Sequence, residues 1–392
     1  MKVLLLPLFT FPTGHSKVSN TMAEWILRKY PQAEIVEMDL LSYSQPRIEK
    51  LISSFYLRWI QWSPKSYGYI YSRWAGRQKD KSKQSKMENF ITSYFGRKLY
   101  QYIQEVKPEF IYCTHSFASR VAINVKETYG LQIPVINVYT DLFINGVWEV
   151  EKANYHFVPT LGAKREIKEL FQLRDEQIFV TGIPIHPDFT EKPVKQANKR
   201  LHVLIAGGNT GLMDIAHLHH LIEHYPHLKF TILCGKNKKL YDDLQAMTSS
   251  TIHIKSYIQS TKEMNELYDT VDAIISKPGG VTISEVIYKE IPLYISHSLP
   301  GPEQINLQYL EDHKMATSVT LSTLTAEKDN FCSPIVLEEM INQMRRHRAV
   351  YTHTVLAAIE SLVLTEQRNH QSILACSMEN VNNLSSVGRI SS

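Results

Sequence analysis

The stretch AIISKPGGVTISEVI, residues 273–287, decides the fold class of this chain. Ala273–Ser276 predicts a short buried strand, and the residues from Val281 onward predict a helix, with a Pro-Gly-Gly turn between them. Paired glycines let the backbone approach a ligand closely, and a helix N-terminus offers free N–H groups to an anion such as a diphosphate. The alternative interpretation is that the strand, turn and helix are only a structural connection and bind no ligand. In either case the unit is typical of an α/β sheet with parallel strands.

Two further polar, glycine-containing loops follow predicted strands in the same half of the chain. The strand Leu293–Ile295 runs into Leu299–Asn306. The strand Val203–Ala206 runs into Gly207–Gly211. The carboxyl ends of parallel strands share one edge of a sheet, which is where ligands bind in open α/β folds. Glu285, early in the predicted helix, could accept hydrogen bonds from ribose hydroxyls, or it could be a surface acid that compensates the helix dipole.

The same alternation of short apolar runs and amphipathic segments fills the first half of the chain. It predicts strands at Val3–Phe9, Phe110–Cys113, Val135–Tyr139, His156–Pro159 and Ile178–Thr181. The stretch His186–Arg200, with two prolines and few large apolar residues, predicts a linker. We therefore expect an α/β protein with two Rossmann-like domains facing each other across a cleft, over residues 1–190 and 200–365. The polar residues 366–392 predict a disordered tail.

The composition is that of an ordinary folded protein and narrows the function classes. The length of 392 residues favours two domains, and a net charge of +4 is too small to argue for nucleic acid by itself. Four dispersed cysteines without a C-x-x-C pair fit neither a zinc site nor a disulfide framework, and they indicate a reducing compartment. No apolar stretch approaches the ~20 residues that span a bilayer. Because Pro7 interrupts the apolar run Met1–Phe9, we interpret this run as a strand rather than a signal peptide.

Two polar side chains in the first half follow predicted strands and are candidates for proton transfer. His15 lies in the loop after the first strand, and an imidazole can take a proton from an acceptor hydroxyl near neutral pH. Asp141 follows the strand Val135–Tyr139. A solvated histidine and a helix-capping aspartate are the structural alternatives. Because both positions lie at carboxyl strand ends, both side chains are expected to face the interdomain cleft.

One segment departs from the α/β pattern, with a cluster of aromatic residues followed by a cluster of basic ones. The aromatic residues are Phe55, Tyr56, Trp59, Trp62, Tyr67, Tyr69, Tyr71 and Trp74. The basic residues are Arg77, Lys79, Lys81, Lys83 and Lys86. This mixture suits the headgroup layer of an anionic membrane, and it also suits stacking on single-stranded nucleic acid. A helical core face followed by a solvated loop is the third interpretation.

Two motifs in the second half carry a family resemblance. Ser276–Glu285 followed by Pro300–Asn306 is similar to the pair (T/S)KPGG-x-T-x-(S/T)E and PGQE-x-x-N. This pair is typical of monogalactosyldiacylglycerol synthases and processive diacylglycerol glucosyltransferases. The chain more distantly resembles the bacterial enzyme that adds N-acetylglucosamine to make lipid II. Further matches support the resemblance, which covers about residues 1–320: Thr181–Ile185, Thr140 and Asp141 with Trp148, and Gly14 with His15.

The resemblance implies a GT-B fold and an inverting hexosyltransferase that uses a UDP-sugar donor. Glu285 would bind the ribose, Gly279 and Gly280 would face the diphosphate, and the second motif would lie near the sugar. The implied donor-binding residues are Gly208, Asn209, Lys277, Gly279, Gly280, Thr282, Glu285, Gly301, Glu303, Gln304 and Asn306. The UDP-sugar is a substrate, so no cofactor is implied. The sequence contains no Asp-x-Asp pair, so a metal ion bound by carboxylates is not expected.

The resemblance also implies a diacylglycerol-type lipid acceptor held by the N-terminal domain. His15 or Asp141 would act as the base or assist it. The implied membrane and acceptor contacts are Trp59, Trp62, Trp74, Arg77, Lys79 and Trp148. We therefore expect an enzyme of glycolipid synthesis in the cytoplasm, peripheral on the inner face of the cell membrane and without a nucleic-acid partner.

Three residues depart from the family pattern. Pro12 replaces the first glycine of G-x-G-H, Asn145 stands where the family often has a histidine, and Pro302 replaces a glutamine. Pro12 and Asn145 leave open a non-catalytic UDP-sugar-binding protein. A UDP-sugar epimerase or hydrolase of similar two-domain shape is the other alternative, although a soluble sugar nucleotide needs no membrane contact.

Overall fold

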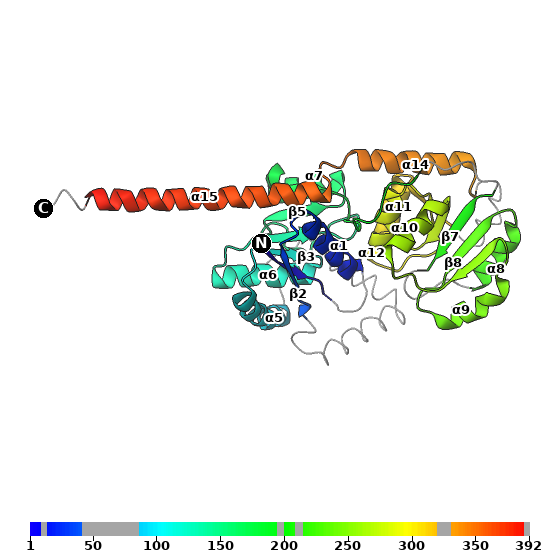
Figure 1. The fold of residues 1–392 in the computed structure, drawn as a ribbon, viewed down its shortest axis with the longest axis horizontal. Coiled ribbons are helices and arrows are strands. Elements are labelled where there is room, and N and C mark those ends of the chain that lie inside the picture. Colours follow the sequence, from blue (N-terminus) through cyan, green and yellow to red (C-terminus); the bar gives the residue numbers. More distant parts are fainter. Residues whose placement is uncertain (9–13, 41–85, 194–199, 208–214, 320–330, 388–392) are drawn as a thin grey trace.

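Two sheets flanked by helices make up the structure, a computed structural model (Figure 1). It describes residues 1–8, 14–40, 86–193, 200–207, 215–319 and 331–387. The first sheet has the order β2-β1-β3-β4-β5-β6, and the second has the order β12-β11-β10-β7-β8-β9. Neighbouring strands in both sheets are parallel. The predicted α/β architecture of two Rossmann-like domains is confirmed.

The first sheet is buried on both faces, so its central strands are mostly apolar, with Asn137 in β4 and His156 in β5 as buried polar residues. Its strands are β1 (Lys2–Leu6), β2 (Glu34–Glu37), β3 (Phe110–Cys113), β4 (Val135–Val138), β5 (Tyr155–Val158) and β6 (Ile178–Val180). Helix α1 packs through Val18 and Met22 on one face, and α5 and α6 cover the other. The helices are α1 (Gly14–Lys29), α5 (Lys86–Val106), α6 (Ser116–Tyr129) and α7 (Leu161–Phe171).

The second sheet is sandwiched in the same way. Its strands are β7 (His202–Ala206), β8 (Lys229–Leu233), β9 (Ile252–Lys255), β10 (Ala273–Ser276), β11 (Leu293–Ile295) and β12 (Ala316–Ser318). Helices α10, α11 and α12 bury apolar residues against one face, and α8 and α9 do so against the other. The helices are α8 (Ile215–His224), α9 (Lys238–Leu244), α10 (Thr261–Thr270), α11 (Gly280–Tyr288), α12 (Pro302–Asp312), α14 (Pro334–Ala349) and α15 (Val355–Val387).

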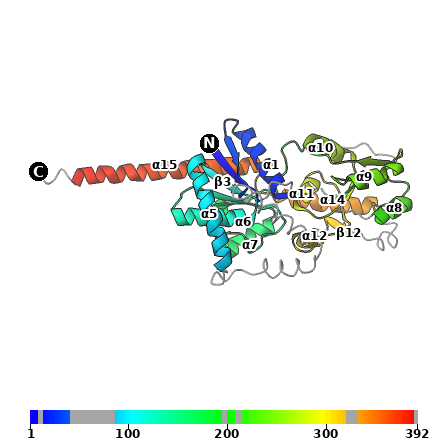
Figure 2. The same ribbon diagram turned by 90° about the horizontal axis from the view of Figure 1, so that it is seen from below.

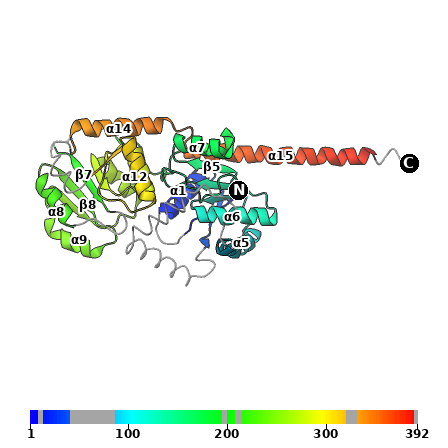
Figure 3. The same cartoon turned by 180° about the vertical axis from the view of Figure 1, so that it is seen from behind.

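Helix α15 leaves the C-terminal half and returns to the N-terminal domain, alongside which it begins (Figures 1 and 3). Its residues Ala358, Ile359 and Leu362 are fully buried, and Glu360 pairs with Lys29 of α1 at 2.9 Å. The sequence predicts a C-terminal domain up to residue 365 and a disordered tail beyond it. The structure instead places the start of α15 on the N-terminal domain, and the helix continues through Val387. Local composition does not reveal a docking surface contributed by α1.

The distal part of α15 extends beyond the domain on which the helix begins (Figure 2). Among the described helices, α15 included, we find none with the length and apolar content needed to cross a bilayer.

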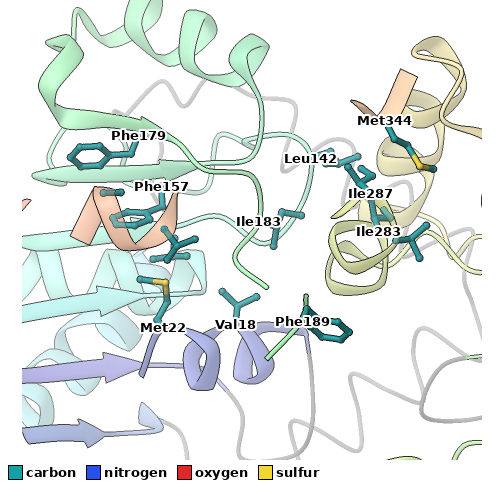
Figure 4. Packing of buried hydrophobic residues seen from close by; sticks show 14 of the residues in the cluster. Val18, Met22, Leu142, Phe157, Phe179, Ile183, Phe189, Ile283, Ile287 and Met344 are labelled. Carbon is teal, nitrogen blue, oxygen red and sulfur yellow. The ribbon is translucent and has the colours of Figure 1, made fainter. Parts of the chain in front are cut away.

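The two domains meet through a shared apolar cluster (Figure 4). Helix α1 of the first domain contacts α11 of the second. Buried side chains from both sides take part, among them Val18, Met22, Leu142, Ile183, Ile283, Ile287 and Met344. This contact brings the strand-end loops of the two sheets together.

The segment that crosses from the first domain to the second is fixed by a buried lysine. Lys289 is fully buried, and its Nζ lies 2.5 Å from Asp269 Oδ1 and donates to the Thr190 carbonyl at 2.8 Å. The Thr190 N–H donates to Asn265 Oδ1 at 3.1 Å. The ammonium group therefore links α10, the end of α11 and the crossing segment.

Replacing Asp269 with asparagine is expected to lower the free energy of unfolding by about 2 kcal/mol, because the buried ammonium loses its counter-charge. Urea denaturation followed by far-UV circular dichroism measures this change. Asp242→Asn is the matched control, since its ion pair with Lys238 is exposed and of the i,i+4 type, so that variant should unfold as the wild type does. Equal losses in both variants would contradict the role given to Lys289.

Candidate functional site

The candidate site lies where the strand order of each sheet reverses. In the first sheet the reversal falls between β1 and β3, and in the second between β7 and β10. Ligands of open α/β sheets bind outside the carboxyl ends of strands at such switch points. The ends of β1 and β3 lead to His15 and His115, and the end of β10 leads to Lys277.

His15 is oriented by two hydrogen bonds at one ring nitrogen. Its Nδ1 lies 2.9 Å from the Thr114 carbonyl oxygen and 3.0 Å from Thr140 Oγ1. A carbonyl can only accept, so Nδ1 carries the hydrogen and Nε2 keeps the lone pair in the neutral ring. Burial lowers the pKa of His15, while the Asp141 charge and the Thr114 bond oppose this shift. At neutral pH the ring is therefore unprotonated and able to accept a proton.

A second histidine, His115, lies against His15 and was not selected from the sequence. The two rings meet edge to face with centroids 4.7 Å apart. His115 Nδ1 accepts from the Phe117 N–H at 3.0 Å and caps α6. Burial lowers its pKa well below 6.5, and the neighbouring His15 adds to this shift. His115 follows the predicted strand Phe110–Cys113, so the strand-end rule that selected His15 could have found it.

Asp141 lies beside His15, at the end of β4, and faces the second domain. Its Oδ1 accepts from Asn306 Nδ2 at 2.9 Å. Burial raises the pKa of Asp141, while the His15 charge and the Asn306 bond lower it and Glu303 raises it further. The two predicted catalytic side chains are therefore close enough to influence each other electrostatically.

The two predicted donor loops of the second domain are joined to each other by an ion pair. Lys277 Nζ lies 2.9 Å from Glu303 Oε1. The other oxygen of Glu303 accepts from the Leu299 N–H at 2.9 Å. Asn306 Nδ2 also donates to the Pro278 carbonyl at 3.2 Å. The loops after β10 and β11 therefore form one polar surface, as their common sheet edge predicts.

The paired glycines at the start of α11 have different surroundings. A Cβ on Gly279 would have no atom within 4 Å, whereas one on Gly280 would lie 1.9 Å from the Thr140 carbonyl oxygen. The sequence predicts that both face a diphosphate, but Gly280 faces the backbone of the other domain here. Gly301 adopts φ 100° and ψ −127° before α12, a conformation that favours glycine. Thr282 lies half-buried in the first turn of α11, and Gln304 is exposed on α12.

Glu285 is buried rather than displayed on the surface. It is only 8% exposed, and its Oε2 accepts from the Tyr268 hydroxyl at 3.0 Å. Burial raises the pKa of Glu285, and Lys17 of the first domain together with Tyr268 opposes this shift. The interpretation of Glu285 as a surface acid is therefore wrong.

Several predicted residues lie outside the described residues, so their predicted roles stay predictions: Gly208, Asn209, Trp59, Trp62, Trp74, Arg77 and Lys79. Trp148 is described, and its ring packs edge to face on Tyr139 with centroids 4.7 Å apart. Asn145 shapes the same loop, since its side-chain oxygen accepts from the Val147 N–H at 3.3 Å. Within the described part of the chain, no three His, Cys, Asp or Glu side chains are grouped to hold a metal ion.

Comparison with known proteins adds the family. The family model of monogalactosyldiacylglycerol (MGDG) synthase matches residues 15–185. The uncharacterized glycosyltransferase YkoN of Bacillus subtilis (strain 168) is 31% identical over 347 residues, covering 88% of this chain and 91% of that protein. The processive diacylglycerol beta-glucosyltransferase of Bacillus cereus (strain B4264) is 27% identical over 322 residues, covering 79% of this chain and 80% of that protein.

A solved structure agrees with the fold. The crystal structure of MurG from Acinetobacter baumannii superposes with a TM-score of 0.57 at 15% identity, covering 94% of this chain and all of that one. At this identity the match speaks for the fold alone, and it confirms the predicted GT-B arrangement of two domains.

Proposed function

The chain belongs to the monogalactosyldiacylglycerol synthase family of glycosyltransferases, and on this basis we propose that it moves a hexose from a UDP-sugar to a diacylglycerol-type lipid at a membrane surface. One observation carries the proposal. Asp141 of the first domain accepts from Asn306 of the second at 2.9 Å, and His15 lies close enough to Asp141 for the two side chains to interact electrostatically. This arrangement supports a site in which the proposed proton acceptor and the helix N-terminus proposed to bind the diphosphate lie close together, as transfer to a hydroxyl requires.

The proposed reaction is a direct displacement at the anomeric carbon. His15 Nε2 takes the proton of the lipid hydroxyl, the hydroxyl oxygen forms the new bond to the anomeric carbon, and the bond to the UDP oxygen breaks. The electron pair of that bond leaves with UDP, and the configuration inverts. An inverting hydrolase needs a second carboxyl group as acid, whereas UDP leaves as a stable anion and one base is sufficient.

The donor is placed by the second domain in this proposal. The N-terminus of α11 offers N–H groups and partial positive charge to the diphosphate, and the space beside Gly279 admits a close approach of the backbone. Glu285 would accept from the ribose hydroxyls, and Tyr268 holds its carboxylate in place at 3.0 Å. Glu303, fixed by Lys277, and Gln304 would lie near the sugar.

The lipid acceptor rests on the family and on the aromatic and basic segment. The relatives named processive diacylglycerol beta-glucosyltransferase act on a diacylglycerol lipid by their names. Basic side chains contribute roughly 1 kcal/mol each to attraction by an anionic surface. We propose that the tryptophans Trp59, Trp62 and Trp74 with Arg77 and Lys79 hold the enzyme at such a surface, and that the site is cytoplasmic.

The decisive experiment is incubation of the full-length protein with radiolabelled UDP-glucose, UDP-galactose or UDP-N-acetylglucosamine and diacylglycerol vesicles, followed by lipid extraction. Label in the lipid phase that is lost in His15→Ala and Glu285→Ala, but not in Asp242→Asn, supports the transferase. Free labelled sugar or an isomerised donor without lipid product would favour the epimerase or hydrolase. Donor binding without turnover would favour the non-catalytic alternative.

The pH profile of kcat/KM tests the base separately. The base must be unprotonated, so activity falls as pH falls through the pKa of His15, and burial places this acid limb below 6.5. The Asp141 charge raises the pKa of His15, so Asp141→Asn is expected to move the limb to still lower pH. Initial rates at low substrate concentration give the profile. If the acid limb of the kcat/KM profile lies above pH 7 and does not move in Asp141→Asn, His15 is not the base.

A further inference from the structure

Asn306 is a fully buried amide that joins the two domains. Its Nδ2 donates to Asp141 Oδ1 at 2.9 Å and to the Pro278 carbonyl at 3.2 Å. Its Oδ1 accepts from the Leu142 N–H at 2.9 Å. Two of these partners belong to the first domain and one to the second. The Leu142 N–H can only donate, and the Asp141 and Pro278 oxygens accept, so the positions of the oxygen and the nitrogen in the amide are determined.

This arrangement uses both N–H groups of the amide. An asparagine side chain has two donor hydrogens, and Asp141 and Pro278 take both. A sugar hydroxyl would therefore have to displace one of these bonds to receive a hydrogen from Asn306. The motif predicts that Asn306 contacts the sugar, but its hydrogen bonds do not support this role.

We infer that Asn306 is a positioning residue, which holds the Asp141 carboxylate and the backbone of its loop against the donor domain. The inference rests on the proposed function, in which Asp141 assists His15. Asn306 lies on α12, which carries Glu303 and Gln304 in its first turn, so the helix that would contact the sugar also orients the acidic side chain of the acceptor domain. The Asp141 carboxylate is thus held in place beside His15 by Asn306 only when the two domains are in contact.

The three partners of Asn306 require a side chain with two donor hydrogens and one acceptor, as an amide has. A leucine would leave the buried Leu142 N–H and the Asp141 carboxylate without partners. An aspartate would set a second carboxylate beside Asp141, where the two charges repel. The asparagine amide combines the two donors with the acceptor that the three partners require.

The test compares the kinetics of Asn306→Ala, Asp141→Asn and the double variant with those of the wild type. Asn306→Ala is expected to lower kcat for lipid glycosylation about 10- to 100-fold, the loss typical of a hydrogen bond to a charged group. The KM for UDP-sugar and the Kd for UDP should stay within about twofold, because the amide does not bind the donor. The double variant should be no slower than Asp141→Asn alone, because Asn306 acts through Asp141.

Two further variants keep the test decisive. Asn306→Asp should be slower than Asn306→Ala at neutral pH, because of the second carboxylate. Asn306→Ser keeps one polar group, should fall between wild type and Asn306→Ala, and replaces the alanine variant if that one does not fold. A raised donor KM, or losses that add in the double variant, would overturn the inference. If the wild type itself makes no lipid product, it is the proposed function that fails, and UDP-sugar turnover of the same variants still tests the inference.

Discussion

Replacing His15 with glutamine is expected to lower kcat/KM for lipid glycosylation by about 10²- to 10⁴-fold, the usual contribution of a general base. Thr114 and Thr140 hold the ring through Nδ1, which leaves Nε2 with the lone pair that accepts the proton. Glutamine keeps a polar side chain but cannot take up a proton at neutral pH. Initial rates with labelled UDP-sugar and diacylglycerol vesicles measure the loss, and the Kd for UDP should not change.

His115→Asn is the matched control for this experiment. An asparagine oxygen can still accept the Phe117 N–H that His115 accepts at 3.0 Å, so the start of α6 stays capped. This variant removes the ring that packs on His15 without removing the proposed base, and it should lose far less activity. A loss below about fivefold in His15→Gln, well under the range for general bases, would move the role of base to Asp141.

The sheets could be predicted well because their signals are local. The predicted strands Phe110–Cys113 and Ala273–Ser276 coincide with β3 and β10. Each is a short apolar run bounded by turn residues, which is how a strand covered on both faces reads in sequence. The first strand ends at Leu6, before Pro7, rather than at Phe9, because proline cannot donate to a ladder.

The candidate site could be predicted only up to its positions at strand ends. The rule that ligands bind at carboxyl strand ends selected His15, Asp141 and the loops around Lys277 and Glu303, and these do come together. The same rule applies to His115, although no motif marks this position.

The partners of these side chains could not be predicted, because they depend on how two distant segments meet. Asn306 and Asp141 lie 165 positions apart and in different domains. No periodicity or local composition links them. The docking of α15 on α1 is the same kind of contact, since the buried Ala358 and Leu362 reveal an apolar helix face but not the surface that covers it.

Replacing Gly280 with alanine is expected to lower kcat/KM by about 10²-fold, the loss that a displacement of about 1 Å at a reacting centre can cause. A Cβ at this position would lie 1.9 Å from the Thr140 carbonyl oxygen, which is backbone and cannot rotate away. The two domains must then move apart, and Thr140 and Asp141 move away from the donor loops. The loss should appear in kcat, and in a changed inter-domain distance measured by fluorescence transfer between labels on α9 and α6.

Gly162→Ala is the control for this substitution. Gly162 also lies in the first turn of a helix, α7, and a Cβ there would meet Thr160 Oγ1 at an ordinary 3.7 Å. Alanine is also the better helix former, so this variant should fold and turn over as the wild type does. If Gly280→Ala keeps full activity, the contact between Gly280 and Thr140 is not part of the productive arrangement. Full activity of this variant would also show that a Cβ at position 280 does not obstruct the approach of the donor, so the predicted contact of Gly280 with the diphosphate would lose its support as well.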